Sequence, residues 1–306
     1  MLIVGPFDCA IISRLHAGGR QLMSHDPKES FSTEGRWGFH LASPGHALFS
    51  ATLIALGVYG LASGHLAGIW QPVPGILPGR EFLVYLCALL ALGTGLGLLC
   101  RSTAASASRL LFAYLLLWFM FFKAPGIFLS PMSAGAYESG GETAVIVSGA
   151  WILYAGFSTK WDHRYLGFAT GKSGICLARG FYSLALIAFG ISHFAYLKLT
   201  ASLVPGWLPG PFAWAYFTGS MYIAAGLGIL TRVYARLAAT LSALQMGLFT
   251  VLVWVPMVMA GSAQAFQWSE LTISWTLTVS ALIVANSYRG RPWLAIGKAS
   301  AQAGTL

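Results

Sequence analysis

The stretch from residue 45 to residue 70 contains no aspartate, glutamate, lysine or arginine. A helix of about 20 apolar residues spans the hydrocarbon core of a bilayer, whereas a soluble domain needs far more charge on its surface. Over the whole chain, hydrophobic residues make up 57% and charged residues 9%, and the mean hydropathy is +0.70. The sequence therefore predicts an all-α, polytopic membrane protein.

Eight apolar stretches have a length that suits a transmembrane helix. Ser43 followed by Pro44 predicts the start of the first helix, because a capping hydroxyl precedes a proline at the first helical position. The flanking segments are a cytoplasmic extension at 1–45, expected to be partly disordered, and a basic tail at 289–306. The eight stretches are residues 46–69, 82–100, 107–129, 143–158, 179–200, 213–231, 234–259 and 268–287.

Most of the basic residues lie on one side of the predicted bundle. All but three of the 18 lysines and arginines lie in the N-terminal extension, in or beside the even-numbered connections, or in the C-terminal tail. Short segments rich in these residues stay in the cytoplasm, so both termini are predicted to be cytoplasmic. The net charge of +9 is spread in small groups instead of forming one patch, which argues against binding to nucleic acid.

Two similar heptads predict an internal repeat. VPGILPG occupies residues 73–79 and VPGWLPG occupies residues 204–210. Proline and glycine interrupt helices, so both heptads are predicted turns on the outer face. A shift of 131 residues aligns 73–125 with 204–256 without a gap, and about a third of the aligned residues are identical. We therefore predict a parallel 4+4 repeat, with four-helix units at 46–158 and 179–288 joined by a basic cytoplasmic linker at 159–178.

The second half resembles a known family. The run FGISHFAYLKLTASLVPGWLPGPFAWAYFTGSMYIAAGLGILTRVYARLAATLSALQMGLF is similar to DoxX proteins of bacteria. The resemblance covers residues 180–287 and extends through the repeat to 48–158. It implies four-helix units in the bacterial cytoplasmic membrane. It also implies a membrane subunit of a quinone-linked redox system, with quinone as the candidate cofactor and a second protein as redox partner. The alternative is a non-enzymatic carrier or scaffold that holds a lipid or small solute between the repeats.

Histidines and glutamates near the outer face are the first candidate site residues. His65 and His193 correspond in the two halves, after a three-residue change of register. An ionisable side chain within a span is a functional hypothesis, although a neutral histidine also serves in packing. Glu142 and Glu270 begin the fourth and eighth stretches, where a carboxylate in the first turn stabilises a helix. Alternatively, each pairs with the histidine of its half to handle protons or bind a metal, although two ligands per half are too few to assign one.

A lysine and two tyrosines complete the set. Lys123 lies within the third stretch, where it is predicted to pair with Glu138 or Glu142 or to contact an anion or a quinone carbonyl. Tyr85 and Tyr216 follow the two heptads by the same number of residues. They are predicted to anchor helices at the level of the lipid head groups or to hold a quinone head group.

Overall fold

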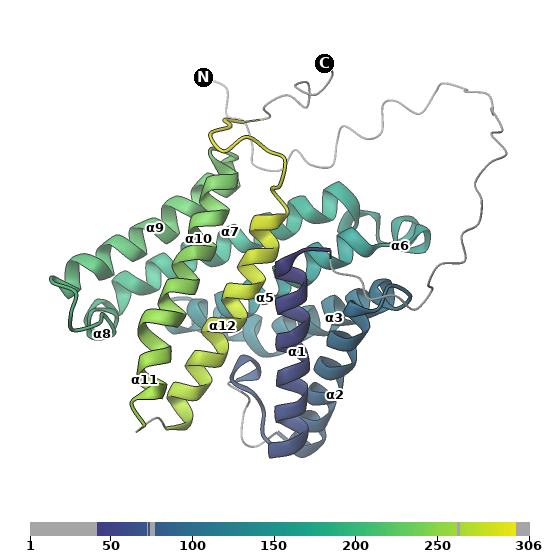
Figure 1. The fold of residues 1–306 in the computed structure, drawn as a ribbon, viewed down its shortest axis with the longest axis horizontal. Coiled ribbons are helices and arrows are strands. Elements are labelled where there is room, and N and C mark those ends of the chain that lie inside the picture. The colour runs from purple at the N-terminus through teal and green to yellow at the C-terminus, as the bar shows by residue number, and fades with distance from the viewer. Residues whose placement is uncertain (1–41, 72, 74–76, 262–263, 298–306) are drawn as a thin grey trace.

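The protein is described by a computed structural model that covers residues 42–71, 73, 77–261 and 264–297. Helices dominate this part of the chain (Figure 1). Seven of the helices in the described part are long and apolar enough to cross a membrane. The chain is thus all-α and has the character of an integral membrane protein. Most of the predicted cytoplasmic extension and the end of the C-terminal tail lie outside the described residues.

Helices follow one another closely along the chain. The first half contains α1 (Pro44–Ser63), η2 (Gly68–Trp70), α2 (Arg80–Leu99), α3 (Ala104–Trp118), η3 (Phe119–Lys123), α4 (Ala124–Leu129) and α5 (Ala134–Phe157). The second half contains α6 (Lys160–Tyr165), η4 (Gly167–Ala169), α7 (Gly171–Ala195), α8 (Leu197–Ser202), α9 (Pro211–Thr231), α10 (Ala235–Phe249), η5 (Thr250–Trp254), α11 (Val255–Met259) and α12 (Ala265–Asn286).

Local chemistry sets where several helices begin. The hydroxyl of Ser43 accepts a hydrogen bond of 3.1 Å from the backbone N–H of His46, so the predicted start of α1 is confirmed. Gly79 and Gly210 end the two heptads in the left-handed conformation, with φ of 76° and 70°, immediately before α2 and α9. Glycine adopts this conformation without a steric penalty. The ends of both heptads are therefore turns, whereas residues 74–76 lie outside the described part.

Three pairs of elements in the described chain begin 131 residues apart. α2 and α9 begin at residues 80 and 211, α3 and α10 at 104 and 235, and η3 and η5 at 119 and 250. Both η3 and η5 are π-helical turns that precede a proline, Pro125 or Pro256. A proline cannot donate to the carbonyl one turn before it and collides with that carbonyl, so the helix widens locally.

The long helices form two layers of four. One layer has the order α10, α12, α1, α2, which stand side by side in Figure 1. The other has the order α9, α7, α5, α3. Contacts of α9 with α10 and of α3 with α2 close the two layers into a ring, and α5 contacts α12 across it. The fourth helix of each half, α5 or α12, packs against the first helix of the other half, α7 or α1. The halves are therefore interleaved.

Three helix ends differ most from the predictions. The fourth long helix, α5, begins at Ala134 instead of residue 143, and α7 begins at Gly171 instead of residue 179. The sequence pattern missed the start of α5 because its first turns carry glycine, tyrosine and glutamate. α1 ends at Ser63, since Gly64 adopts a left-handed conformation with a φ of 67° and ends the helix there.

Candidate functional site

A cavity of about 710 Å³ opens between α5, α7, α9, α12 and η5. The start of α5, which reads as polar in the sequence, supplies part of its wall. Apolar and aromatic side chains form most of the remaining wall. The polar residues that line it are Gln71, Glu138, Ser139, Glu142, Ser192, His193, Tyr196, Thr200, Tyr222, Ser269, Glu270 and Ser274.

Three glutamates make this cavity acidic. The carboxyl group of Glu142 lies close enough to Glu138, Glu270 and Lys123 for their charges to interact. The one ion pair in the described part of the chain lies elsewhere and joins Arg109 of α3 to Asp162 of α6. The three carboxyl groups therefore face the cavity without a direct ionic partner among the described residues. We refer to this space as the acidic cavity.

Lys123 lies beside the acidic cavity, on the π-helical turn η3. Its side chain is 4% exposed, so it does not extend to the surface. The ammonium group donates a hydrogen bond of 2.8 Å to the hydroxyl of Ser139 and another to the backbone carbonyl of Gln71. The predicted ion pair with Glu138 or Glu142 is not formed. Instead, the lysine connects the segment after α1 to α5 and places a positive charge near Glu142.

His193 projects from α7 into the acidic cavity. Its Nδ1 lies 2.8 Å from the backbone carbonyl oxygen of Phe189. A carbonyl oxygen only accepts hydrogen bonds, so Nδ1 carries the proton and Nε2 of the neutral ring is a proton acceptor. The ring also stands edge-on to Tyr222, with centroids 5.4 Å apart. Packing thus fixes the orientation of the imidazole.

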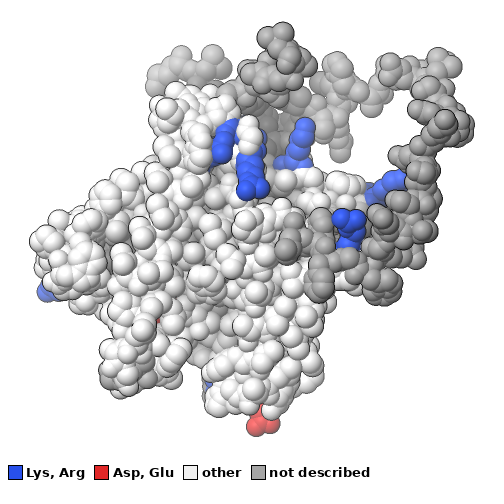
Figure 2. Space-filling view, in the orientation of Figure 1, with Lys and Arg blue, Asp and Glu red and all other residues white. Residues whose placement is uncertain are grey.

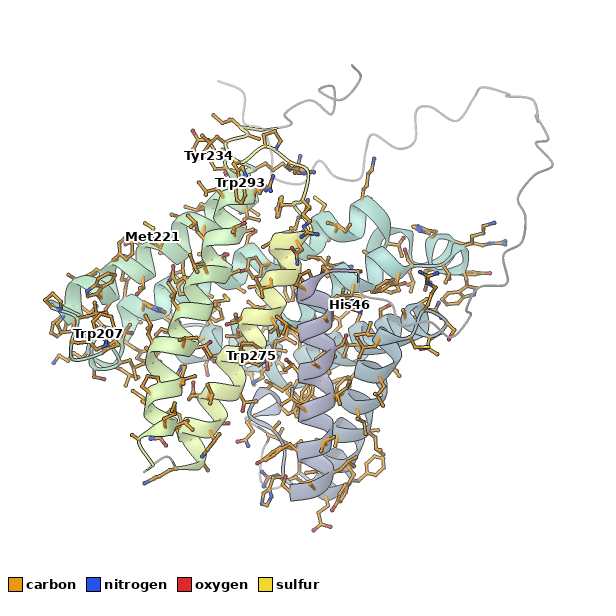
Figure 3. All side chains as sticks on the ribbon, viewed as in Figure 1. His46, Trp207, Met221, Tyr234, Trp275 and Trp293 are labelled. Carbon is orange, nitrogen blue, oxygen red and sulfur yellow. The ribbon has the colours of Figure 1, made fainter. Side chains whose placement is uncertain are left out.

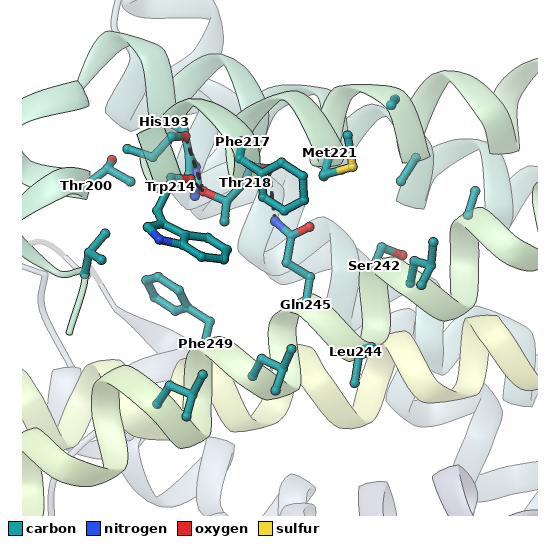
Figure 4. Close-up of a pocket in the computed structure, with 18 of the residues that line it drawn as sticks. His193, Thr200, Trp214, Phe217, Thr218, Met221, Ser242, Leu244, Gln245 and Phe249 are labelled. Atoms are coloured by element: carbon teal, nitrogen blue, oxygen red, sulfur yellow. Dashed lines mark hydrogen bonds between the residues drawn. The ribbon is translucent and has the colours of Figure 1, made fainter. Parts of the chain in front are cut away.

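A second, apolar cavity of about 830 Å³ lies along the crossing of α9 and α10. Figure 4 shows Trp214, Phe217 and Met221 from α9 facing Leu244 and Phe249 from α10. Several of its side chains are exposed on the lateral surface of the bundle, which faces acyl chains in a membrane protein. We call it the apolar groove. The residues that it shares with the acidic cavity are His193, Thr200, Leu203 and Phe249.

The other predicted site residues lie outside both cavities. His65 is exposed, and its Nδ1 bonds to the backbone carbonyl of Ser63 at 2.6 Å. Tyr85 and Tyr216 are 48% and 51% exposed. Of the predicted site residues, the structure thus brings together His193, Glu142, Glu270 and the neighbouring Lys123, and it leaves His65, Tyr85 and Tyr216 at the surface.

The interpretation of the glutamates as helix-start residues is wrong. The first turns of α5 and α12 contain no acidic residue, because both helices begin several residues before their glutamate. Ser133 caps α5, and Gln264 with Gln267 forms a capping box at the start of α12. Stabilisation of free amide groups therefore does not explain Glu142 or Glu270.

Sequence reasoning missed two aromatic contributors and the role of a third glutamate. Tyr196 and Tyr222 line the acidic cavity, and Glu138 joins it as a wall residue. A sequence signal existed for Glu138, because it precedes Glu142 by four residues and so shares its helix face. No comparable signal singles out Tyr222.

Comparison of the chain with family models, with curated proteins and with solved structures finds no match. The resemblance to DoxX proteins therefore receives no support from these comparisons. Within the described residues, no group of three or more histidine, cysteine, aspartate and glutamate side chains is arranged to hold a metal ion.

Proposed function

We propose that the chain crosses the membrane eight times, with α5 as the eighth span and both termini in the cytoplasm. The 24 residues of α5 extend over about 36 Å at 1.5 Å per residue, which is enough to cross the hydrocarbon core. Lysine and arginine gather at the end of the bundle near which the described chain ends, and acidic side chains appear at the opposite end (Figure 2). This distribution favours the cytoplasm at the basic end.

The proposal includes a duplicated four-helix unit of the DoxX type in a bacterial cytoplasmic membrane. The equal spacing of α2 and α9, α3 and α10, and η3 and η5 supports the duplication, because unrelated helices would not share one offset. Assignment to the DoxX family rests on the sequence pattern at 180–287.

The proposed function is binding of a quinone or quinol by a membrane subunit of a redox system. The observation that carries it is the junction of the acidic cavity with the apolar groove at His193. A quinone has a polar head and an isoprenoid tail, so the head fits the acidic cavity and the tail fits the groove between α9 and α10. Most small-molecule sites combine such an apolar wall with a few oriented polar groups.

The acidic cavity contains both kinds of group that quinone chemistry requires. His193 Nε2 and the carboxylates of Glu142 and Glu270 accept protons from the hydroxyls of a quinol. The Tyr196 hydroxyl accepts a hydrogen bond of 3.0 Å from the N–H of Gly135, so its own proton is available to a quinone carbonyl. This chain then holds the head group and transfers protons, while a partner protein exchanges the electrons.

Retention of quinone by the purified protein tests this function. The protein is placed in lipid nanodiscs and equilibrated with menaquinone-4, and bound quinone is extracted and quantified. His193→Ala and Glu270→Gln are expected to reduce binding about tenfold or more, because each removes a polar contact to the head group. His65→Ala is the matched control and should bind like the wild type. Equal binding by all four proteins would overturn the assignment of the site.

The role of the groove is tested with a variant that fills it. Leu244 lines the groove and is 54% exposed, so Leu244→Trp adds bulk without disturbing a buried position. The variant should bind menaquinone-4 more weakly while keeping its affinity for a tail-less quinone such as duroquinone. A parallel loss of both ligands would show that the groove does not hold the tail.

A non-enzymatic carrier is the second candidate. The acidic cavity holds three glutamates and one neighbouring lysine, and a carboxyl group pairs well with an amine, so this candidate would hold a small solute that carries an amine. A carrier predicts that an amphipathic amine competes with quinone and that no electron donor supports quinone reduction. Binding of menaquinone-4 that dodecylamine fails to displace would exclude this candidate.

A further inference from the structure

Arginines gather at the end of the bundle where α9 ends and α10 and the segment after α12 begin. Arg236 lies in the first turn of α10, and Arg289 and Arg291 follow α12. Arg179 comes from α7 and donates hydrogen bonds to the hydroxyl and the backbone carbonyl of Ser287 at the end of α12. Blue side chains mark this end of the molecule in Figure 2, and no red appears among them in that view.

The segment after α12 folds back over the turn between α9 and α10. The N–H of Tyr234 donates to the carbonyl of Ala295 at 2.9 Å, and Val233 forms an isolated antiparallel bridge with Ile296. Arg236 donates a hydrogen bond of 2.6 Å to the backbone carbonyl of Arg291. These contacts hold residues 288–297 against the bundle. We call residues 288–297 the returning segment.

Like charges come together around two aromatic rings. The guanidinium of Arg179 lies 3.7 Å from the centroid of Tyr288, and that of Arg291 lies 5.8 Å from the same ring. Arg236 lies over Trp293 at 3.9 Å. Arg179 and Arg291 are close enough for their charges to repel each other. No carboxylate of the described residues forms an ion pair with them, so this end carries an uncompensated positive potential within the described part.

Apolar side chains project beside these arginines. Trp293, Leu294 and Ile296 of the returning segment are 47%, 68% and 65% exposed. Figure 3 shows Trp293 and Tyr234 together at this end of the bundle. An aromatic ring, aliphatic side chains and arginines at the end of a membrane helix match the interface of a bilayer, where lipid head groups meet acyl chains.

We propose that this end of the bundle is a binding site for an anionic phospholipid. The phosphate of the lipid lies among Arg236, Arg289 and Arg291, and Trp293 and Leu294 lie between neighbouring lipids of the same leaflet. Arginine presents its donors in a planar fork that fits a phosphate. Basic clusters on the cytoplasmic side of membrane helices bind acidic lipid head groups in this way. The site is independent of the quinone proposal, because none of the residues proposed to contact the lipid lines either cavity.

The test measures how tightly phosphatidylglycerol binds to the full chain. The protein is purified in detergent, titrated with phosphatidylglycerol or phosphatidylcholine, and analysed by native mass spectrometry. Arg289→Gln with Arg291→Gln should weaken phosphatidylglycerol binding roughly 25-fold, since each arginine near a charged surface contributes about a fivefold change in affinity. Phosphatidylcholine binding should not change. Both arginines are exposed, and their guanidinium groups form no hydrogen bond among the described residues. The fold should therefore persist in the double variant.

Controls separate the lipid from other sources of negative charge. Arg80→Gln removes an exposed arginine at the opposite end of the bundle and should leave phosphatidylglycerol binding unchanged. Inorganic phosphate at millimolar concentration should not displace the lipid, because it lacks the acyl chains that contact Trp293 and Leu294. Equal affinity for the two lipids, unchanged binding in the double variant, or displacement by inorganic phosphate would each overturn the proposal.

Discussion

Asp162 shows how one buried charge holds the linker between the halves. Its carboxylate is fully buried and accepts hydrogen bonds from Nε and Nη2 of Arg109 at 2.6 and 2.8 Å. The hydroxyl and N–H of Thr159 and the hydroxyl of Tyr154 donate to the same carboxylate. Burial by itself would raise the pKa of Asp162, but these donors outweigh it and hold the pKa well below the usual range of an aspartate.

We predict that Asp162→Asn destabilises the protein by about 2 kcal/mol and removes part of its sensitivity to acid. A carboxylate whose pKa is lower in the folded state stabilises the fold above the unfolded-state pKa of about 4, and this contribution disappears as the pH falls further. Thermal unfolding in detergent at pH 3 to 7 measures both effects. The wild type should lose stability below pH 4 more steeply than the variant.

An exposed carboxylate provides the control for this prediction. Glu81→Gln, at the start of α2, should leave the pH profile of unfolding as it is in the wild type. An Asp162→Asn variant with the same melting temperature and the same acid slope as the wild type would contradict the proposed role of the ion pair.

Single residues also mark what a sequence can and cannot predict. His193, Glu142 and Glu270 were identifiable because charged and imidazole side chains are rare in apolar stretches. Their partners were not, because the charges that act on Glu142 come from two other segments, η3 and α12, as well as from its own helix. The contacts of Lys123 depend on the π-helical turn η3, which changes the direction of side chains by an amount that no periodicity reveals.

At the scale of elements, the crossing of α7 and α9 depends on close backbone approach. A Cβ atom added at Gly190 would lie 2.5 Å from the carbonyl oxygen of Gly219 and 2.4 Å from Ile223. Both distances are far below van der Waals contact. Small residues at such crossings let helices pack through dispersion and backbone contacts in lipid. Not every glycine of α7 lies at such a contact, because a Cβ atom added at Gly180 would meet nothing within 4 Å.

A pair of alanine substitutions on α7 tests this crossing. Gly190→Ala should lower stability by about 2 kcal/mol, because helix separation outweighs the gain in helix propensity. Gly180→Ala is the matched control, since a Cβ there meets nothing within 4 Å. It should leave the melting temperature unchanged or raise it. Equal melting temperatures of the two variants would show that close backbone contact at Gly190 does not determine how tightly α7 packs on α9.

Elements were predictable where the sequence punctuates them strongly. Ser43 with Pro44, Gly79 and Gly210 mark helix starts through capping chemistry and positive φ. The start of α5 was not predictable from hydropathy, because Glu138 and Glu142 face a cavity instead of lipid. Apolar stretches reveal the lipid-facing part of a membrane helix, so a helix that lines a polar cavity appears shorter than it is.

At the scale of the whole molecule, the interleaved ring makes each half depend on the other. α5 lies between α3, α7 and α12, and Val145, Val147 and Ala150 on it are fully buried. A four-helix unit cut from its partner would expose part of this surface. A sequence repeat predicts two similar units, but it does not determine whether the fourth helix packs within its own half or on the other one.

The two halves should therefore fold together but not separately. A break between residues 166 and 167 divides the chain before α7 and leaves α6, which pairs with α3 through Asp162 and Arg109, on the first fragment. Produced alone, each fragment should aggregate in detergent. The contacts of α5 with α7 and of α1 with α12 join the two fragments, so each fragment alone exposes the surfaces that these contacts bury. Produced together with an affinity tag on one fragment, the two should co-purify as a monodisperse complex by size-exclusion chromatography. Two fragments that are each monodisperse and do not associate would show that α5 and α12 pack within their own halves. The acidic cavity would then not form, because its wall takes Glu138 and Glu142 from one half and His193 and Glu270 from the other.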